Sequence, residues 1–483
     1  MSETVLGIDL GTSAVKCVLT QSGRVVGVGS SPLSVSAPHP GWSEQNPADW
    51  INATKLACKS ALSSAGLNGD VIKGIALSGQ MHGAVLLDAQ QQVLRPAILW
   101  NDNRSTAECA LLSERLSEIG EIAGVPPLPG FTAPKLMWLK RHEPETHSKV
   151  RTILLPKDYI AFWLTGALGT DISDAAGTLW LDQAQRQWSD DAIAASDIDA
   201  SWLPELRHGF DVVGGVQSHA AQGLGIAVDT PVFAGGADAA AGALSIGAAS
   251  AGRCFISLGT SGQLLVVDDS YQPNPAQFVH AYCHTLPNLW YRMAAMLNGA
   301  RPLSWFASIL GCSVEELLEQ AALADTDRIP VFLPYLTGER SPHGDPKIRG
   351  SFYGLDDATS RREMCRAVVE AIAFAMRDSF DSFGDDFAPK VTIPVIGGGS
   401  RSDLVLQTLA TVLGHSVART DSGAEGPAYG AALLAEVGLG QRSISDLSFD
   451  AQLTDRFDPE LDPAFFQRLD KYRRLYGALR NAI

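Results

Sequence analysis

The chain has no apolar run of membrane-spanning length, no Cys-x-x-Cys pair and no excess of basic residues. Its longest stretch of small and apolar residues, 232–250, is broken by Asp238 and indicates tight packing, not a membrane helix. The start of the chain lacks the basic residues of a secretory signal. Its seven cysteines, an odd number, indicate free or buried thiols in a reducing compartment. We therefore expect a cytoplasmic protein.

Positive charge is scarce: 37 Lys and Arg residues stand against 53 Asp and Glu, which gives a formal net charge of −16. Such an acidic surface repels polyanions, so nucleic acid and anionic membranes are not expected partners. What the sequence does have is an ordinary globular composition, with 46% hydrophobic and 19% charged residues. Its 483 residues exceed what one hydrophobic core usually holds and predict two domains.

A Gly-Thr-Ser turn between two strand-like runs occurs once in each half of the chain. The first copy is Gly11, Thr12 and Ser13, and the second is Gly259, Thr260 and Ser261. Glycine lets the backbone approach a phosphate closely, and the hydroxyls add donors beside exposed backbone N–H groups. Either copy alone is more often an ordinary hairpin turn. A matched pair predicts two turns that grip one polyphosphate from both sides.

Only the first copy carries a carboxylate inside the motif, because Asp9 stands where the second copy has Ser257. Next to phosphates, Asp9 would suit a Mg²⁺ ion bound through water, since magnesium gives up its hydration shell reluctantly. The alternative is a turn aspartate that caps its own backbone.

Strand-like and helix-like segments alternate in both halves, which predicts an α/β fold of mixed sheets flanked by helices. In the first half we expect a hairpin at 5–19, strands at 25–35 and 71–77, and a helix at 47–65 capped by Asn46. In the second half we expect a strand pair at 253–267, a strand at 391–396, and helices at 302–310, 313–324, from 360 past 374, at 403–413 and at 463–481. The small residues of 242–252 predict a hinge, with a boundary near 247 and the active site in the cleft between domains 1–247 and 248–483.

An apolar strand at 231–234 runs through two glycines into an Ala-rich helix, which leaves Asp238 near the N-terminus of that helix. The helix field favours the ionised carboxylate, so we expect Asp238 to be a weak base that orients a hydroxyl and takes its proton late in phosphoryl transfer. A simple N-cap is the alternative. The place of Asp238 just before the second Gly-Thr-Ser turn favours catalysis.

Together these motifs resemble the FGGY carbohydrate kinases, which belong to the actin-like ATPase fold. The resemblance runs from Val5 to about Leu439 and is carried by the paired turns and by segments 131–138, 338–343, 350–355 and 397–399. Segments 79–84, 99–102, 155–159 and 173–178 resemble family members that phosphorylate a ketopentose. The resemblance implies ATP and Mg²⁺ as cofactors, a small sugar as the acceptor, and a homodimer as one expected assembly.

The resemblance also implies roles for single residues. Met81 and His82 fall at the sugar-contact pair, Asp238 at the catalytic base, Gly11, Thr12, Ser13, Gly259 and Thr260 at the phosphate turns, and Gly398, Gly399 and Asp403 at the adenine end. His82 can exchange hydrogen bonds with a sugar hydroxyl, and Met81 can pack against the carbon face. A satisfied surface histidine is the alternative for His82.

Three further residues or pairs have open roles. Trp100 stacks on the sugar or, more commonly for a tryptophan, fills the core. Asp102 and the pair Lys157–Asp158 are either ligands or structural ion partners.

One departure from the family pattern concerns the sugar. Family members usually show Gly-Gly-Gly-Asp-Asn, whereas this chain has Ala239 after Asp238. Loss of that amide could weaken sugar binding by about 1–3 kcal/mol. Another ketopentose such as ribulose, or a polyol, therefore stays open as the substrate. A nucleotide-switched module like actin or the heat-shock chaperones is the alternative of another class, although no client-binding domain follows the second half.

Overall fold

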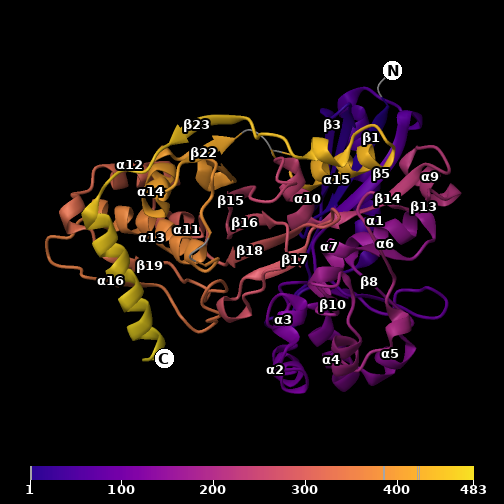
Figure 1. Ribbon diagram of the computed structural model, residues 1–483, viewed down its shortest axis with the longest axis horizontal. Helices are drawn as coiled ribbons and strands as arrows, with labels where there is room; N and C mark the ends of the chain where they lie inside the picture. Colours follow the sequence, from indigo (N-terminus) through magenta and orange to yellow (C-terminus); the bar gives the residue numbers. More distant parts are fainter. Residues whose placement is uncertain (1–2, 385–386, 421–422, 424, 483) are drawn as a thin grey trace.

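The computed structural model describes residues 3–384, 387–420, 423 and 425–482. The chain forms two lobes, each built around one mixed β-sheet with helices packed on it (Figure 1). This architecture confirms the predicted α/β class.

The first lobe is built on a six-stranded sheet whose strand order is β13-β14-β5-β1-β2-β3. Its strands are β1 (Thr4–Leu10), β2 (Ala14–Gln21), β3 (Arg24–Pro32), β5 (Ile72–Gly79), β13 (Val212–Gly215) and β14 (Pro231–Ala237). The helices packed around it are α1 (Pro47–Ala65), α6 (Pro156–Thr165), α9 (Ser218–Leu224), α10 (Asp238–Ser245) and α15 (Pro427–Gly438).

The rest of the first half forms smaller pieces beside this sheet. Its short strands are β4 (Glu44–Gln45), β6 (Val85–Leu87), β7 (Ala97–Ile98), β8 (Thr152–Leu154), β9 (Gly169–Asp171), β10 (Leu181–Asp182), β11 (Gln187–Trp188) and β12 (Glu205–Arg207). Its helices are α2 (Thr106–Arg115), α3 (Ile119–Ala123), α4 (Thr132–His142), α5 (Pro144–Lys149), α7 (Ile172–Ala175) and α8 (Asp190–Ala195).

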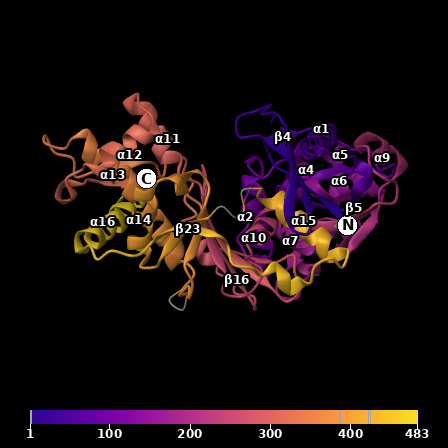
Figure 2. The same ribbon diagram turned by 90° about the horizontal axis from the view of Figure 1, so that it is seen from above.

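The second lobe has a seven-stranded sheet in the order β17-β18-β16-β15-β21-β22-β23. Its strands are β15 (Cys254–Leu258), β16 (Gly262–Asp268), β17 (His280–Cys283), β18 (Trp290–Met296), β21 (Ile393–Ile396), β22 (Val417–Thr420) and β23 (Leu453–Phe457), with a separate pair β19 (Val331–Leu333) and β20 (Ser351–Tyr353). The helices are α11 (Arg301–Leu310), α12 (Val314–Ala322), α13 (Arg361–Asp381), α14 (Asp403–Leu413) and α16 (Pro463–Arg480). Seen from above, helices α11–α14 and α16 lie at one end of the molecule and α1, α6 and α15 at the other (Figure 2).

Local sequence signals fix several of these elements. Each Gly-Thr-Ser turn joins the two strands of an antiparallel hairpin, β1–β2 or β15–β16, as predicted. The Asn46 side chain accepts a hydrogen bond from the Ala48 N–H and caps α1. Ser360 and Glu363 form a capping box that starts α13.

The hinge prediction is wrong for its first residues. Residues 242–245 are helical because α10 continues to Ser245, which follows from the high helix propensity of its alanines. All seven cysteines are free thiols, as predicted. In the described part of the chain, no helix combines the length and the apolar character that crossing a membrane requires.

Helix α15 belongs to the second half of the sequence but packs against β1, β5, β14 and α10 of the first lobe (Figure 1). Apolar side chains pack in this contact, and at two glycines the backbones themselves meet. A Cβ on Gly7 would lie 1.9 Å from the Ala428 carbonyl oxygen, and a Cβ on Gly430 would lie 1.8 Å from the Ala241 carbonyl oxygen. The buried Glu436 carboxylate accepts hydrogen bonds from the Thr20 hydroxyl and the Gly23 N–H, each at 2.8 Å. The last part of the chain thus ties back to the first sheet.

Two helical glycines allow a matched test of this packing. Gly430→Ala should lower the melting temperature, because its methyl group would displace the backbone of α10 or α15, at a cost on the order of 2 kcal/mol or more. Gly477→Ala in α16 has no atom within 4 Å of the added Cβ. It should raise stability by about 0.5–1 kcal/mol through helix propensity. Calorimetry of both variants checks the opposite signs, and equal melting temperatures would refute the close contact.

Candidate functional site

Three predicted site segments lie at one edge of the first sheet. β1, β5 and β14 are neighbouring parallel strands whose carboxyl ends pair at Leu10, Gly79 and Ala237. The first Gly-Thr-Ser turn follows β1, the pair Met81–His82 follows β5, and Asp238 follows β14. Ligands of α/β sheets usually bind at this edge. Residues far apart in the sequence are thereby brought to one place by the topology.

A cavity of about 180 Å³ joins this edge to the second lobe. Asp238 and Ala239 line it from α10, while Ser257 and Gln263 line it from β15 and β16. The residue that departs from the family pattern, Ala239, therefore faces the same small space as Asp238.

Asp238 is the first residue of α10 and follows the N-cap Ala237. Its Oδ1 accepts a hydrogen bond of 2.7 Å from the Ala239 N–H. Burial raises the pKa of Asp238 to about 6, although that hydrogen bond lowers it. The helix field alone would favour a low pKa, and the raised value follows from removal of water from the carboxylate. The role of Asp238 as a weak base stays a prediction. With a pKa near 6 the group is still ionised at neutral pH and is a stronger proton acceptor.

Asp9 lies within β1, opposite Lys16 of β2 and Ser78 of β5, so the alternative of a turn aspartate is wrong. Burial, followed by the charge of Asp238, raises the pKa of Asp9 to about 7. Its buried Oδ1 has no hydrogen-bond partner among the described residues. A carboxylate oxygen in this condition fits a hard cation such as Mg²⁺, which would supply the missing partner.

The first Gly-Thr-Ser turn is bonded to its own lobe. The Thr12 hydroxyl donates to Gln80 Oε1 and accepts from Trp100 Nε1, both at 2.9 Å. Ser13 is exposed, and Gly11 closes the turn through a backbone hydrogen bond of 3.1 Å to Ala14. None of these three turn residues lines the cavity at Asp238. The link between the turn and Gln80, the residue before Met81, had no signal in the sequence.

Trp100 is 38% exposed, so its interpretation as a core residue is wrong. Its indole is held at the surface by the hydrogen bond to Thr12.

A larger cavity of about 890 Å³ lies in the second lobe. Gly259 and Thr260 line it beside Gly398 and Gly399, because their segments follow the parallel neighbours β15 and β21. Sequence reasoning missed its other walls, which come from α11, α12 and the segment after Gly399: Ala300, Arg301, Leu303, Ser304, Val314, Glu315, Leu318, Glu319, Ala322, Arg401 and Ser402. The amphipathic pattern of α11 and α12 was the one sequence signal that could have indicated these walls.

Asp403 lies outside that cavity. Its exposed carboxylate forms an ion pair of 2.7 Å with Arg419, and the cavity is lined by the preceding Ser402 instead. A nucleotide in the cavity would therefore meet Ser402 before Asp403.

His82 is enclosed, unlike a surface histidine. Its Nδ1 lies 2.7 Å from the Gly177 carbonyl oxygen, which can only accept, so Nδ1 carries the hydrogen. Burial holds the pKa of His82 well below its usual value, which makes the ring neutral and leaves Nε2 as an acceptor. Gly177 has no room for a side chain, because a Cβ there would lie 2.7 Å from His82 Nδ1 and 2.9 Å from Met81 Cε.

Asp102 and the pair Lys157–Asp158, whose roles the sequence left undecided, form structural ion pairs. Lys157 is fully buried and contacts Asp158, Asp171 and Asp174 at 2.5, 3.0 and 3.6 Å. Burial would lower the pKa of Lys157, but the three carboxylates together raise it. Asp102 in turn accepts hydrogen bonds from Arg104 at both carboxylate oxygens, one from Nε and one from Nη2.

The Lys157 cluster is also linked to strand β14, which ends at Ala237. Asp171 accepts a hydrogen bond of 2.5 Å from the Ser173 hydroxyl, and that oxygen accepts one of 3.0 Å from the Ala237 N–H. Ala237 precedes Asp238, so this chain of contacts places the start of α10.

Both halves of the chain match models of one protein family. The model of the FGGY family of carbohydrate kinases, N-terminal domain, matches residues 4–245, and the C-terminal domain model matches residues 254–439. The chain is 42% identical to the xylulose kinase of Escherichia coli strain K12, over 98% of this chain and 99% of the relative. It is 44% identical to the xylulose kinase of Klebsiella pneumoniae, over 90% of each chain.

Solved structures agree with this match. A xyloylose kinase from Brucella ovis superposes with a TM-score of 0.94 at 39% identity, over 99% of this chain and all of the other. A ligand-bound xylulose kinase from Lactobacillus acidophilus gives a TM-score of 0.91 at 27% identity, over 99% of this chain and 98% of the other.

Asp238→Asn tests the burial of charge. The pKa of Asp238 rises from 3.8 to about 6, so the folded protein binds more protons than the unfolded one between these values. Stability is therefore lost as pH rises through that window. We expect the variant to be more stable than the parent at pH 8, on the order of 1–2 kcal/mol, and equal to it at pH 4.

Thermal melts across this pH range measure the difference. The control is Asp191→Asn, an exposed aspartate in the first turn of α8, which should give no gain at pH 8. A lower melting temperature for Asp238→Asn at pH 8 would contradict the expected burial cost.

Proposed function

The chain belongs to the FGGY family of carbohydrate kinases, and from this membership we propose that it transfers the γ-phosphoryl group of ATP to the terminal hydroxyl of D-xylulose, giving D-xylulose 5-phosphate. The sugar is supported by the xylulose kinases to which the chain is 38–44% identical. The observation that carries the reaction is Asp238, whose carboxylate has a pKa near 6 and lines a cavity between the two lobes.

Strand β15 supports the proposed path of the phosphoryl group. Ser257 on this strand lines the small cavity at Asp238, and Gly259, two residues further, lines the large cavity of the second lobe. Two residues of strand span about 7 Å. An ATP molecule with its adenosine beside Gly398 and Gly399 would therefore direct its γ-phosphate past Thr260 towards Asp238. Asp403 stays a prediction for the adenine end.

Asp238 would orient the sugar hydroxyl and receive its proton as the new P–O bond forms. Met81 would contact the carbon chain of the sugar, and His82 Nε2 would accept a hydrogen bond from a hydroxyl. Asp9 is the residue proposed to hold Mg²⁺, with Asp238 beside it. Mg²⁺ would neutralise the charge of the phosphates when bound.

The two domains proposed are 1–247 and 248–483, with α15 packed back on the first. The turn at Gly11, Thr12 and Ser13 would reach the phosphates when the lobes close, which would also keep water from the phosphoryl group. We further propose that the enzyme works in the cytoplasm without nucleic acid or membrane partners, in line with its net charge of −16. A homodimer stays a prediction.

A second substrate class, another ketopentose or a polyol, is favoured by one observation. Ala239 lines the small cavity where the family pattern has an amide side chain. A switch protein of the actin or chaperone type is disfavoured because the chain aligns with xylulose kinases over nearly its whole length.

The test of function is ADP release by purified protein with Mg²⁺ across D-xylulose, D-ribulose, L-ribulose, xylitol, glycerol and no sugar. We expect D-xylulose to be preferred and turnover to fall as pH drops through 6, because protonated Asp238 cannot accept the hydroxyl proton. Asp238→Ala should abolish sugar-dependent turnover while leaving ATP affinity near that of the parent. Preference for another sugar would show that D-xylulose is not the main substrate. Full turnover by Asp238→Ala would show that Asp238 has no part in the mechanism.

Ala239→Asn tests the sugar contact. The added amide should lower the KM for D-xylulose, by up to about tenfold for one hydrogen bond, with little change in the KM for ATP. Ala239→Leu is the matched control, since it fills similar space without a polar group and should not lower the KM. An unchanged or higher KM for Ala239→Asn would show that no sugar hydroxyl lies unpaired there.

A further inference from the structure

The backbone at His82 has an uncommon conformation. Its φ is 68°, in the left-handed region that residues with a side chain rarely adopt. Such a conformation persists only where the surroundings hold it. The segment is fixed before the histidine by a hydrogen bond of 2.9 Å from Gln80 N–H to the Leu10 carbonyl. After it, Gly83 packs so closely on Pro156 that a Cβ would lie 2.5 Å from the proline ring.

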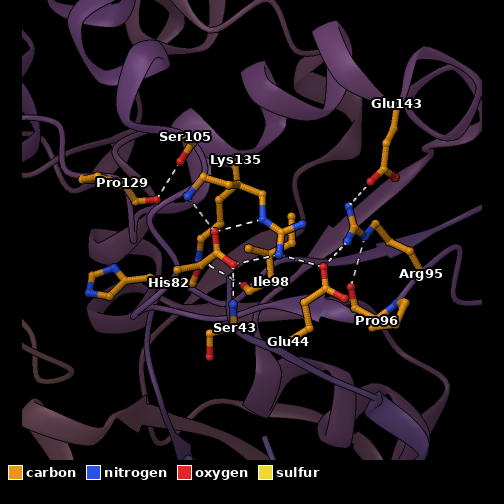
Figure 3. Close-up of polar contacts among 12 residues, drawn as sticks. Ser43, Glu44, His82, Arg95, Pro96, Ile98, Ser105, Pro129, Lys135 and Glu143 are labelled. Carbon is orange, nitrogen blue, oxygen red and sulfur yellow. Dashed lines mark hydrogen bonds and ion pairs between the residues drawn. The ribbon is translucent and has the colours of Figure 1, made fainter. Parts of the chain in front are cut away.

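The carbonyl of His82 is held by two side chains of α4. Thr132 Oγ1 donates to it at 3.1 Å and Lys135 Nζ at 2.8 Å. Figure 3 shows Lys135 reaching this carbonyl and that of Ile98, to which it donates at 3.1 Å. Lys135 is fully buried, and burial holds its pKa well below the usual value while Asp102 opposes that shift. A buried amine that bonds two carbonyls joins β7 to the loop after β5.

Helix α4 is itself anchored. The Arg104 guanidinium lies 3.6 Å from the ring centre of Trp42 and 5.1 Å from that of Trp138, which belongs to α4. Arg104 also forms ion pairs of 2.7 Å with Asp102 and with Glu44. Helix α4, which carries the donors Thr132 and Lys135, is therefore held in place by the contacts of Arg104.

We propose that Thr132 and Lys135 are positioning residues that fix the His82 backbone and, through it, aim the imidazole Nε2 at the sugar. With the carbonyl held, Nδ1 meets the Gly177 carbonyl and Nε2 is left for the ligand. This inference rests on the proposed sugar contact of His82. Its effect is on sugar binding, because neither side chain reaches the reacting atoms.

Thr132 offers a conservative test. Thr132→Val removes one hydrogen bond to the His82 carbonyl and should raise the KM for D-xylulose about threefold, with kcat and the KM for ATP within about twofold of the parent. Thr132→Ser keeps the hydroxyl and should restore the parental KM. Lys135→Met should raise the sugar KM about tenfold or more, whereas Lys140→Met, an exposed lysine of the same helix, should leave it unchanged.

A double-mutant cycle decides whether the effect passes through the imidazole. In a His82→Ala background, Thr132→Val should add no further rise in the sugar KM. The proposal is overturned if Thr132→Val raises the KM equally in both backgrounds, or if Thr132→Ser behaves like Thr132→Val. A Lys135→Met chain that does not fold leaves the Thr132 series to decide. Sugar-dependent turnover by the parent tests the proposed function, and the KM ratios on whichever sugar it uses test the positioning.

Discussion

The carboxylates of Asp9 and Asp238 are held out of water at one edge of the first sheet, and much of the surrounding structure is organised by the cost of keeping them there. Burial raises the pKa of both groups. A second buried cluster lies nearby, where the single ammonium of Lys157 contacts three carboxylates. Burial raises the pKa of Asp158 and Asp174 in that cluster. Asp238 lies beside a cavity and forms no ion pair with the residues that the structure describes. A site of this kind is unstable by itself, and it persists because the sheet and α10 position it.

The two lobes share the site through few elements. Strand β15 lines the small cavity and the turn after it lines the large one, while α15 crosses from the second half of the sequence to the first sheet. The end of β14 is placed from its own lobe through Ser173, and Thr285 of the second half donates to the Gly235 carbonyl at 2.8 Å. The strand that ends at Asp238 is thus fixed from both halves of the chain.

Local signals predicted the local structure well. The hairpins around the Gly-Thr-Ser turns, the start of α1 at Asn46 and the start of α13 at Ser360 follow from turn chemistry and capping. The resemblance placed the site segments, and the fold brings them to strand ends. The raised pKa of Asp238 could not be predicted, because burial depends on residues distant in the sequence.

Side-chain contacts between distant segments could not be predicted either. No sequence pattern links Thr12 to Gln80 or Asp403 to Arg419, although the structure joins both pairs. The exposure of Trp100 likewise depends on how distant segments pack. The return of α15 to the first lobe is a property of the topology, which local propensity does not encode.

The contacts of α15 with β1 and with α10 constrain how this sequence can diverge. In a core of side chains, a larger residue at one position can be offset by a smaller one beside it. Gly7 and Gly430 meet carbonyl oxygens, and a carbonyl cannot be made smaller by any substitution. No neighbouring substitution can therefore make room for a side chain at either position, so homologues that retain this packing must retain glycine there.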